Sequence, residues 1–353
     1  MPALDDLGWD ASLASVFEPY RAQGFEPARV VAEHQHVYTL LTEQAELFAR
    51  VTGRLRHEAS GRADFPAVGD WVAARPQPGE EWATIHAILP RRSRFSRKVA
   101  GDDAEEQIVA ANIDTVFLVM GLDGDFNPRR MERYLALAWD SGSSPVVLLS
   151  KLDLCDDPDG RRREIEALGA PVHLVSAKTG AGLEALASYL KPGLTLALLG
   201  SSGVGKSTLV NRLLGEERLR TAEVRASDDR GRHTTSAREL LPLPGGALII
   251  DTPGMRELQL WDASAGLQAA FSDVEALAAE CRFTDCGHER EPGCAVRVAI
   301  EAGQLPAERL ASYQKLQREL GALAVRQDRR LEAEQRKKWR SIHKLARKHK
   351  PRG

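Results

Sequence analysis

The chain has 353 residues, 43% of them apolar and 28% charged, which is the composition of an ordinary soluble protein but more chain than one compact core usually holds. From this length we expect two or three domains. No run approaches the roughly 18 uninterrupted apolar residues of a membrane helix, and the acidic start lacks the features of a signal peptide, so we expect a cytoplasmic protein without a membrane partner. The formal net charge of −2 conceals an asymmetry, because residues 326–353 hold 12 Lys/Arg and three Asp/Glu, a net +9, against −11 for the other residues.

After an N-terminal extension over residues 1–27, residues 28–100 contain short β-like runs separated by Gly, Pro and polar residues. The runs are ARVVAEH, HVYTLLT, AELFARVT, GDWVAARP and WATIHAIL. This pattern predicts a small OB-like β-barrel. A basic run from Arg91 to Lys98 closes it and is either a solvated loop or an RNA contact. Gly101, Asp102 and Asp103, with further acids, predict a linker.

Residues 101–262 have a different hydrophobic pattern, because apolar runs without alternation begin at Ile113. These runs are IDTVFLVM, PVVLLS, PVHLVSA, LTLALLG and ALIIDT, and helical stretches such as PRRMERYLALAWDSG and RRREIEALG separate them. Continuous apolar strands alternating with helices predict an α/β domain, in which a parallel sheet is covered on both faces.

Two short motifs at strand ends indicate recognition of guanine. Ser150, Lys151, Leu152 and Asp153 follow the run PVVLL as an [NT]-K-x-D motif would, and Ser176, Ala177 and Lys178 follow PVHLV as the companion loop that supports the base. The Asp153 carboxylate can accept both the N1 and the 2-amino hydrogens of guanine, a pattern that adenine does not offer. Parallel sheets bind ligands at the carboxyl ends of their strands, so these motifs are expected to meet.

The fourth apolar run leads into a complete phosphate-loop motif, G-x-x-x-x-G-K-[ST]. Its residues are Gly200, Ser201, Ser202, Gly203, Val204, Gly205, Lys206, Ser207 and Thr208. The glycines let backbone amides turn toward a phosphate, Lys206 reaches the β and γ oxygens, and the Ser207 hydroxyl ligates Mg²⁺. The helix that follows presents its positive N-terminal end to the same anion.

A second phosphate motif follows the run ALII. Asp251 begins the sequence Asp-Thr-Pro-Gly, where a phosphate-loop protein needs a carboxylate for the Mg²⁺ shell, and the amide of Gly254 would sense the γ-phosphate. Met255 occupies the position at which Ras-like enzymes carry the Gln that orients water, so we expect a slow intrinsic rate.

The first switch is expected in Gly231-Arg232-His233-Thr234-Thr235. A threonine there would complete the Mg²⁺ shell, and we favour Thr234 over Thr235 for this role. His233 could orient the attacking water and Arg232 could counter charge, although a loop residue without chemistry is the alternative.

The order of these motifs is that of a circular permutation, because the base-reading elements at 150 and 176 precede the phosphate loop at 200 and Asp251. Ordinary GTPases begin with the phosphate loop. Permutation leaves the site intact in space but places the γ-phosphate sensors directly before the C-terminal domain, so coupling between that domain and the nucleotide state is a natural hypothesis.

Three of the four cysteines gather in a short window together with a histidine. The four residues are Cys281, Cys286, His288 and Cys294. Clustered thiols in a reducing compartment indicate a metal, and three thiolates with one imidazole make a closed tetrahedral zinc site that is structural, not catalytic. Cys155, the remaining thiol, is expected to be a small buried or surface residue.

The zinc ligands belong to a predicted helical domain over residues 263–325. A short helix over CAVRVAIEAG stops at Gly303, and a helix led by Pro306 carries apolar residues at helical spacing. That stripe comprises Leu310, Tyr313, Leu316, Leu320 and Leu323, and we expect it to pack in the core. Residues 326–353 form a basic tail that includes Trp339 and is either a solvated helix end or an arm that binds polyanions.

With these motifs together, the chain resembles the ribosome small subunit-dependent GTPase A family, RsgA, also called YjeQ. The resemblance covers nearly the whole chain, from Gly69-Asp70-Trp71-Val72 in the barrel to the permuted core and the C-x4-C-x-H-x5-C cluster. It implies one structural Zn²⁺, Mg²⁺ with GTP, and a monomer that binds the small (30S) ribosomal subunit and its rRNA. Ser150 departs from the Asn usual in the family, which is expected to weaken nucleotide affinity.

Two functions remain open at this stage. The resemblance implies an assembly GTPase that binds the immature small subunit in its GTP state, is stimulated by it and leaves on hydrolysis. The alternative is a nucleotide-gated module that binds another RNA or a membrane-associated partner, with hydrolysis incidental.

Overall fold

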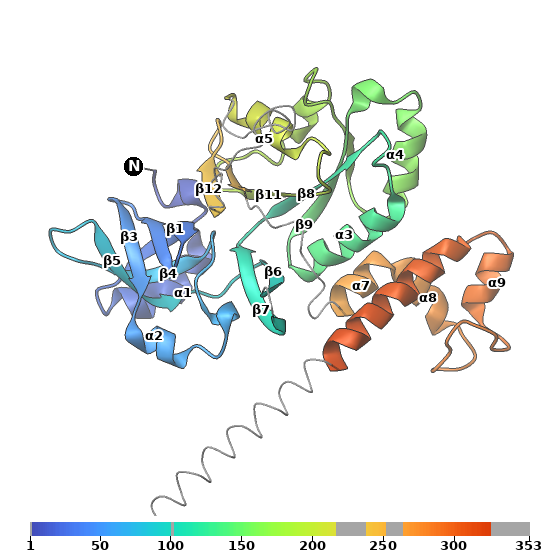
Figure 1. Cartoon of the computed structure of the whole chain (residues 1–353), viewed down its shortest axis with the longest axis horizontal. Coiled ribbons are helices and arrows are strands. Elements are labelled where there is room, and N and C mark those ends of the chain that lie inside the picture. Colours follow the sequence, from blue (N-terminus) through green and yellow to red (C-terminus); the bar gives the residue numbers. More distant parts are fainter. Residues whose placement is uncertain (1, 100–101, 217–237, 252–263, 326–353) are drawn as a thin grey trace, which may run out of the picture.

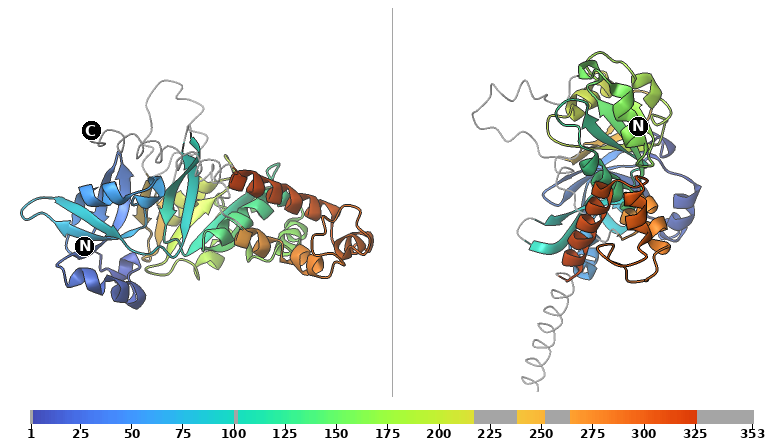
Figure 2. Two further views of the ribbon diagram at one scale, coloured as in Figure 1. Left: turned by 90° about the horizontal axis from the view of Figure 1, so that it is seen from below. Right: turned by 90° about the vertical axis from the view of Figure 1, so that its right-hand side faces the viewer.

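The structure is a computed structural model that describes residues 2–99, 102–216, 238–251 and 264–325. A β-barrel, a central α/β domain and a group of C-terminal helices follow one another along an elongated molecule, with the barrel at one end and the helices at the other (Figures 1 and 2). Among the described residues, no helix has both the length and the apolar character that crossing a membrane would require.

Five strands form the N-terminal barrel, and all five predicted runs are confirmed. The strands are β1 (Glu26–His34), β2 (Val37–Leu41), β3 (Glu46–Val51), β4 (Trp71–Pro76) and β5 (Trp82–Ile88). β1 pairs with both β2 and β4, and β3 pairs in parallel with β5, so the sheet closes on itself. β3 alternates strictly between exposed and buried residues, which directs one side of the strand into the barrel core.

Short helices cover the barrel and its junction with the next domain. They are η1 (Asp5–Leu7), α1 (Ala11–Arg21), α2 (Gly53–Glu58) and η2 (Arg62–Asp64). α1 begins where the Asp10 carboxylate accepts the Leu13 amide at 3.0 Å, an N-cap that satisfies one of the unpaired donors of the first turn. Leu13 and Phe17 of this helix are buried in the main core.

A two-stranded ribbon stands beside the barrel (Figure 1). Strands β6 (Arg94–Val99) and β7 (Asp102–Ala111) pair with each other in an antiparallel hairpin. The linker predicted at Asp102 and Asp103 is therefore wrong. β7 begins with acidic residues, which led to the linker prediction, but its second half is apolar, and residues 108–111 are all buried.

The central domain has five parallel strands in the order β10-β9-β8-β11-β13. They are β8 (Thr115–Gly121), β9 (Ser144–Ser150), β10 (Val172–Leu174), β11 (Thr195–Leu199) and β13 (Leu248–Asp251). β12 (Arg238–Pro242), which the sequence analysis did not identify, runs antiparallel to β13. On its other edge β12 pairs with β1, so one sheet of 11 strands continues from this domain into the barrel.

Both faces of the parallel sheet are covered, as its continuous apolar strands predicted. The covering elements are α3 (Pro128–Asp140), η3 (Leu152–Leu154), α4 (Pro158–Glu166), η4 (Leu183–Leu186) and α5 (Lys206–Leu214). Alternate residues of β8 point to opposite faces, so Val116 and Leu118 join the core of α3 and α4, whereas Phe117 and Val119 join that of α5.

The C-terminal helices pack against α3. They are α7 (Ser264–Ala270), α8 (Ser272–Ala279), α9 (Ala295–Glu301) and a helix over residues 307–325. Leu310, Tyr313 and Leu316 of the predicted stripe are buried in the main core, and Leu320 packs against it.

Arg309 fastens these helices to the central domain. Its guanidinium binds both Asp273 carboxylate oxygens at 2.8 Å and the Glu132 carboxylate of α3 at 3.1 Å, and it donates to the Ala270 carbonyl at 2.7 Å. One side chain therefore joins α3, α7 and α8.

Arg29 plays the corresponding part at the barrel. Its guanidinium is fully buried and donates to the Leu7 and Gly69 carbonyls, to the Asn112 carbonyl and to the Thr195 hydroxyl at 2.7 Å. These acceptors come from the N-terminal segment, the barrel, the hairpin exit and β11. Burial lowers the pKa of Arg29 to about 10, so the side chain stays protonated at neutral pH.

We expect Arg29→Ala to destabilise the junction by about 3 kcal/mol, because several buried acceptors would lose their donor at once. Urea denaturation followed by tryptophan fluorescence measures the change. Arg21→Ala is the matched control, since that side chain is 53% exposed. Equal midpoints for the two variants would contradict the role given to Arg29.

Candidate functional site

The loops singled out in the sequence lie at one edge of the parallel sheet. β9 and β11 flank β8 in parallel, β10 adjoins β9, and β13 adjoins β11, so their carboxyl ends point the same way. Ser150 is the last residue of β9 and Asp251 the last of β13, while residues 176–178 and 200–208 come just after β10 and β11. The chain order is shuffled, but the strand ends are adjacent.

The phosphate loop has the backbone that its glycines predict. Gly203 and Gly205 adopt φ of 77° and 100°, in the left-handed region that residues other than glycine rarely adopt. A Cβ on Gly200 would lie 2.3 Å from the Val119 carbonyl oxygen, so only glycine fits there. The Lys206 ammonium lies over the loop and donates to the Gly200 carbonyl at 2.7 Å and the Ser201 carbonyl at 2.5 Å.

Ser207 and Thr208 occupy the first turn of α5, immediately beyond Lys206. Ser207 is half-buried and Thr208 is exposed. The helix start therefore places a hydroxyl oxygen beside the loop, which is the hard ligand that Mg²⁺ prefers.

Ser150 connects the base-reading loop to the phosphate loop. Its hydroxyl is buried, donates to the Val204 carbonyl at 2.8 Å and lies 3.3 Å from the Met120 carbonyl. An Asn at this position would tether the phosphate loop, and the shorter Ser makes the same tether through one oxygen. The departure from the family pattern therefore leaves this connection intact.

Asp153 and Ser176 meet, as the two base motifs predict. The Ser176 hydroxyl is buried and donates to Asp153 Oδ1 at 2.6 Å. This hydrogen bond lowers the pKa of the exposed Asp153 carboxyl, which keeps it ionised as an acceptor. Lys178 is exposed, and its charge acts in the same direction. Leu152 and Ala177 pack their side chains against the cores below.

Two carboxylates that the sequence analysis missed adjoin both loops. Asp123 Oδ2 pairs with the Lys151 ammonium at 2.6 Å, and this contact lowers the pKa of Asp123. Asp125 Oδ1 accepts the Ser201 hydroxyl at 2.7 Å. Both residues follow β8, so the rule that ligand sites lie at the ends of parallel strands could have identified them.

Several predicted residues lie outside the part of the chain that the structure describes. They are Arg232, His233, Thr234, Thr235, Gly254 and Met255. Their roles stay predictions.

The predicted metal ligands gather at the start of α9. The Cys281 and Cys294 sulfurs are 3.9 Å apart and lie 3.7 and 3.5 Å from His288 Nδ1, and with Cys286 all four ligand atoms are within 4.8 Å of one another. Tetrahedral zinc, with Zn–S bonds of about 2.3 Å and a Zn–N bond of about 2.0 Å, requires separations of about 3.5 to 3.8 Å. The cluster could therefore hold a zinc ion.

Glu291 shapes the loop that carries the histidine. Its carboxylate accepts the backbone amides of Gly287 at 2.9 Å, Glu289 at 2.8 Å and Arg290 at 2.9 Å. The backbone amide of Glu291 itself, followed by that of Gly287, lowers the pKa of this carboxyl. His288, inside this loop, has φ of 59°, a strained value that the surrounding amide contacts support. Cys155 lies apart, half-buried against the main core.

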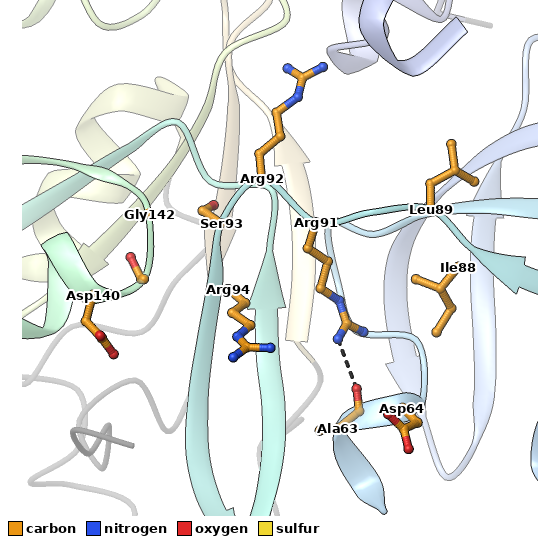
Figure 3. Close-up of a pocket in the computed structure, with 11 residues that line it drawn as sticks. Ala63, Asp64, Ile88, Leu89, Arg91, Arg92, Ser93, Arg94, Asp140 and Gly142 are labelled. Atoms are coloured by element: carbon orange, nitrogen blue, oxygen red, sulfur yellow. Dashed lines mark hydrogen bonds between the residues drawn. The ribbon is translucent and has the colours of Figure 1, made fainter. Parts of the chain in front are cut away.

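The arginines of the basic run after the barrel differ in their contacts. Arg91 forms a bidentate pair with the fully buried Asp70 at 2.8 Å and donates to the Ala63 carbonyl, as the dashed line in Figure 3 shows. It is thus a structural residue, and reading it as a solvated or RNA-binding side chain is wrong. Arg92 extends away from it to Asp10, whereas Arg94 is exposed along β6 beside a hollow of about 550 Å³.

Comparison with known proteins identifies the family. A model described as RsgA GTPase matches residues 88–261. A relative from Opitutus terrae, named small ribosomal subunit biogenesis GTPase RsgA, is 53% identical over 96% of both chains. The chain belongs to the RsgA GTPase family. A relative of the same name from Syntrophotalea carbinolica is 46% identical over 96% of this chain and 98% of its own.

Solved structures agree with membership of the RsgA family. The crystal structure of YjeQ from Thermotoga maritima, 29% identical, covers 84% of this chain and 98% of its own with a TM-score of 0.63. YloQ, described as a circularly permuted GTPase, is 22% identical with a TM-score of 0.60 and shows the same fold. The chain is therefore a circularly permuted, GTP-hydrolysing enzyme.

We expect GTP and GDP to bind at least about tenfold more tightly than ATP, because adenine lacks the N1 and 2-amino hydrogens that the Asp153 carboxylate would accept. Competition against a fluorescent GDP analogue measures this. Asp153→Asn should lose GTP and gain XTP, whose 2-carbonyl oxygen accepts from the new amide. Asp156→Asn, an exposed carboxylate in the same loop, is the control. Equal competition by ATP would contradict the assignment of Asp153.

Proposed function

We propose that this GTPase hydrolyses GTP to GDP and phosphate as a late maturation factor of the small (30S) ribosomal subunit. The observation that carries the proposal is the relative from Opitutus terrae, which is named a small ribosomal subunit biogenesis GTPase and whose sequence matches nearly from end to end. We further propose that the subunit stimulates hydrolysis, that hydrolysis releases the protein, and that it acts in the cytoplasm as a monomer.

The nucleotide would lie across the loops at the carboxyl edge of the sheet. Asp153 would read guanine, with Ser176 holding that carboxylate in place at 2.6 Å. The backbone amides of residues 200–208 and the Lys206 ammonium would bind the β and γ phosphates. The tether from Ser150 to Val204 supports this arrangement, because it fixes the distance between the base and phosphate loops.

Magnesium would be held by Ser207, at the start of α5, and by Thr234 from the first switch. The ion would neutralise charge on the phosphates. Asp251 would support its water shell, and the Gly254 amide would sense the γ-phosphate. His233 would orient the attacking water with Arg232 nearby, and Met255 in place of Gln would make hydrolysis slow without the subunit.

The C-terminal region would serve as the part that responds to the ribosome. One zinc ion on Cys281, Cys286, His288 and Cys294 would hold the α8–α9 connection, a structural role typical of a closed tetrahedral site. The basic tail over residues 326–353 would bind rRNA through its net charge of +9.

Co-sedimentation with purified small subunits tests the proposal. We expect the protein to bind in the presence of a non-hydrolysable GTP analogue and to dissociate with GDP. Subunits should raise GTP turnover by at least about tenfold, the factor that 1.4 kcal/mol of transition-state stabilisation gives. Binding that ignores the nucleotide, with turnover unchanged by subunits, would instead support a module for another RNA with incidental hydrolysis.

We expect one zinc ion per chain in the purified protein. The variant Cys286→Ser should lose both this ion and the folded state of the C-terminal helices, because metal binding contributes directly to the stability of such sites. Metal analysis and circular dichroism measure the two effects. Cys155→Ser removes a thiol outside the cluster and should leave both unchanged. A metal-free protein with its helices intact would contradict the zinc site.

A further inference from the structure

The loop between β8 and α3 is the element that connects the two nucleotide-binding loops. We call residues 122–127 the acidic loop, since it carries Asp123 and Asp125. Asp123 Oδ1 accepts the Asp125 amide at 3.1 Å, which folds the loop tightly over Gly121. A Cβ at Gly121 would lie 2.4 Å from that same oxygen, so any larger residue there would displace the Asp123 carboxylate.

Asp125 is held on three sides. Its Oδ1 accepts the Ser201 hydroxyl at 2.7 Å and pairs with the Arg130 guanidinium at 2.7 Å, while its Oδ2 lies 3.3 Å from the Gly121 amide. Its side chain is 20% exposed. The carboxylate therefore links the end of β8, the first turn of α3 and the phosphate loop.

Ser201 is in turn fixed at two atoms. Its hydroxyl is bound by Asp125, and its carbonyl accepts from the Lys206 ammonium at 2.5 Å. Fixing both atoms sets the plane of the peptide that follows Ser201, whose amide belongs to the loop that would surround the phosphates. A loop whose amides already point inward loses less conformational entropy when an anion binds.

A carboxylate beside a phosphate site would repel the ligand if its charge stood alone. Here the Arg130 guanidinium lies against Asp125 and also donates to its main-chain carbonyl, so the pair is close to neutral. Asn127, whose side chain accepts the Arg130 amide at 3.1 Å, caps α3 and sets the position of this arginine. The acidic loop thus supplies a charge-assisted hydrogen bond without a net negative field.

We propose that Asp125 is a positioning residue for nucleotide binding, which orders the phosphate loop through Ser201 while Asp123 of the same loop holds Lys151 of the base-reading motif. The inference rests on the proposed nucleotide site. Nucleotide affinity would then depend on Asp125, a residue outside every motif recognised in the sequence.

Asp125→Ala tests the proposal. We expect the Kd for GDP and the KM for GTP to rise about tenfold, the loss typical of one charge-assisted hydrogen bond, with kcat within about twofold of the wild type. Asp125→Asn keeps an oxygen that accepts from Ser201, so its Kd should stay within about threefold of the wild type. Fluorescent GDP titration and steady-state kinetics give these values.

A double-mutant cycle isolates the contact. Ser201→Ala should raise the Kd as Asp125→Ala does, and the double variant should be no worse than Asp125→Ala, because both changes remove the same hydrogen bond. Asp156→Ala, which deletes an exposed carboxylate near the base loop, should bind like the wild type. Thermal melting of every variant shows whether the fold is retained.

Three outcomes would overturn the inference: an Asp125→Ala affinity equal to that of Asp156→Ala, additive effects in the double variant, or a fall in kcat with KM unchanged. Failure of the nucleotide site itself is distinguishable, because it would appear in the wild-type protein as binding without preference for GTP.

Discussion

The parallel pairing of β9, β8, β11 and β13 is the constraint on which the site depends. Strands that run the same way end at the same edge, so the loops that follow them meet whatever their order in the chain. The buried hydrogen bond from Ser150 to Val204 spans this edge and holds residues 54 positions apart in contact. Permutation is tolerated because it changes where the chain starts and not which strands are neighbours.

Buried arginines attach the other two parts to this sheet. Arg29 joins the barrel to β11 through carbonyl and hydroxyl acceptors, and Arg309 joins the C-terminal helices to α3 through carboxylates. Multidentate polar contacts of this kind have strict geometry, so they favour one orientation over others that would bury a similar apolar area. The positions of the barrel and the helices relative to the site are specified by these contacts as well as by apolar packing.

Much of this arrangement could be predicted from the sequence, because it depends on local patterns. Continuous apolar runs predicted the five parallel strands, the G-x-x-x-x-G-K-[ST] pattern predicted the loop before α5, and the spacing of Cys281 to Cys294 predicted the cluster. Partners that meet only in three dimensions could not be predicted. Arg91 belongs to a basic run in the sequence, but its partner Asp70 is 21 positions away. Asp125, the partner of Ser201, is 76 positions away and belongs to no motif.

The pairing of β12 with β1 has a mechanical consequence. Ala32 lies opposite Glu239 and Glu33 opposite Arg238, so backbone hydrogen bonds run without interruption from the edge of the nucleotide domain into the barrel. The barrel and the nucleotide domain therefore share one continuous sheet, in which β12 is the strand common to both. A change in the position of β12 would act on β1 through the backbone, without any side chain as an intermediary.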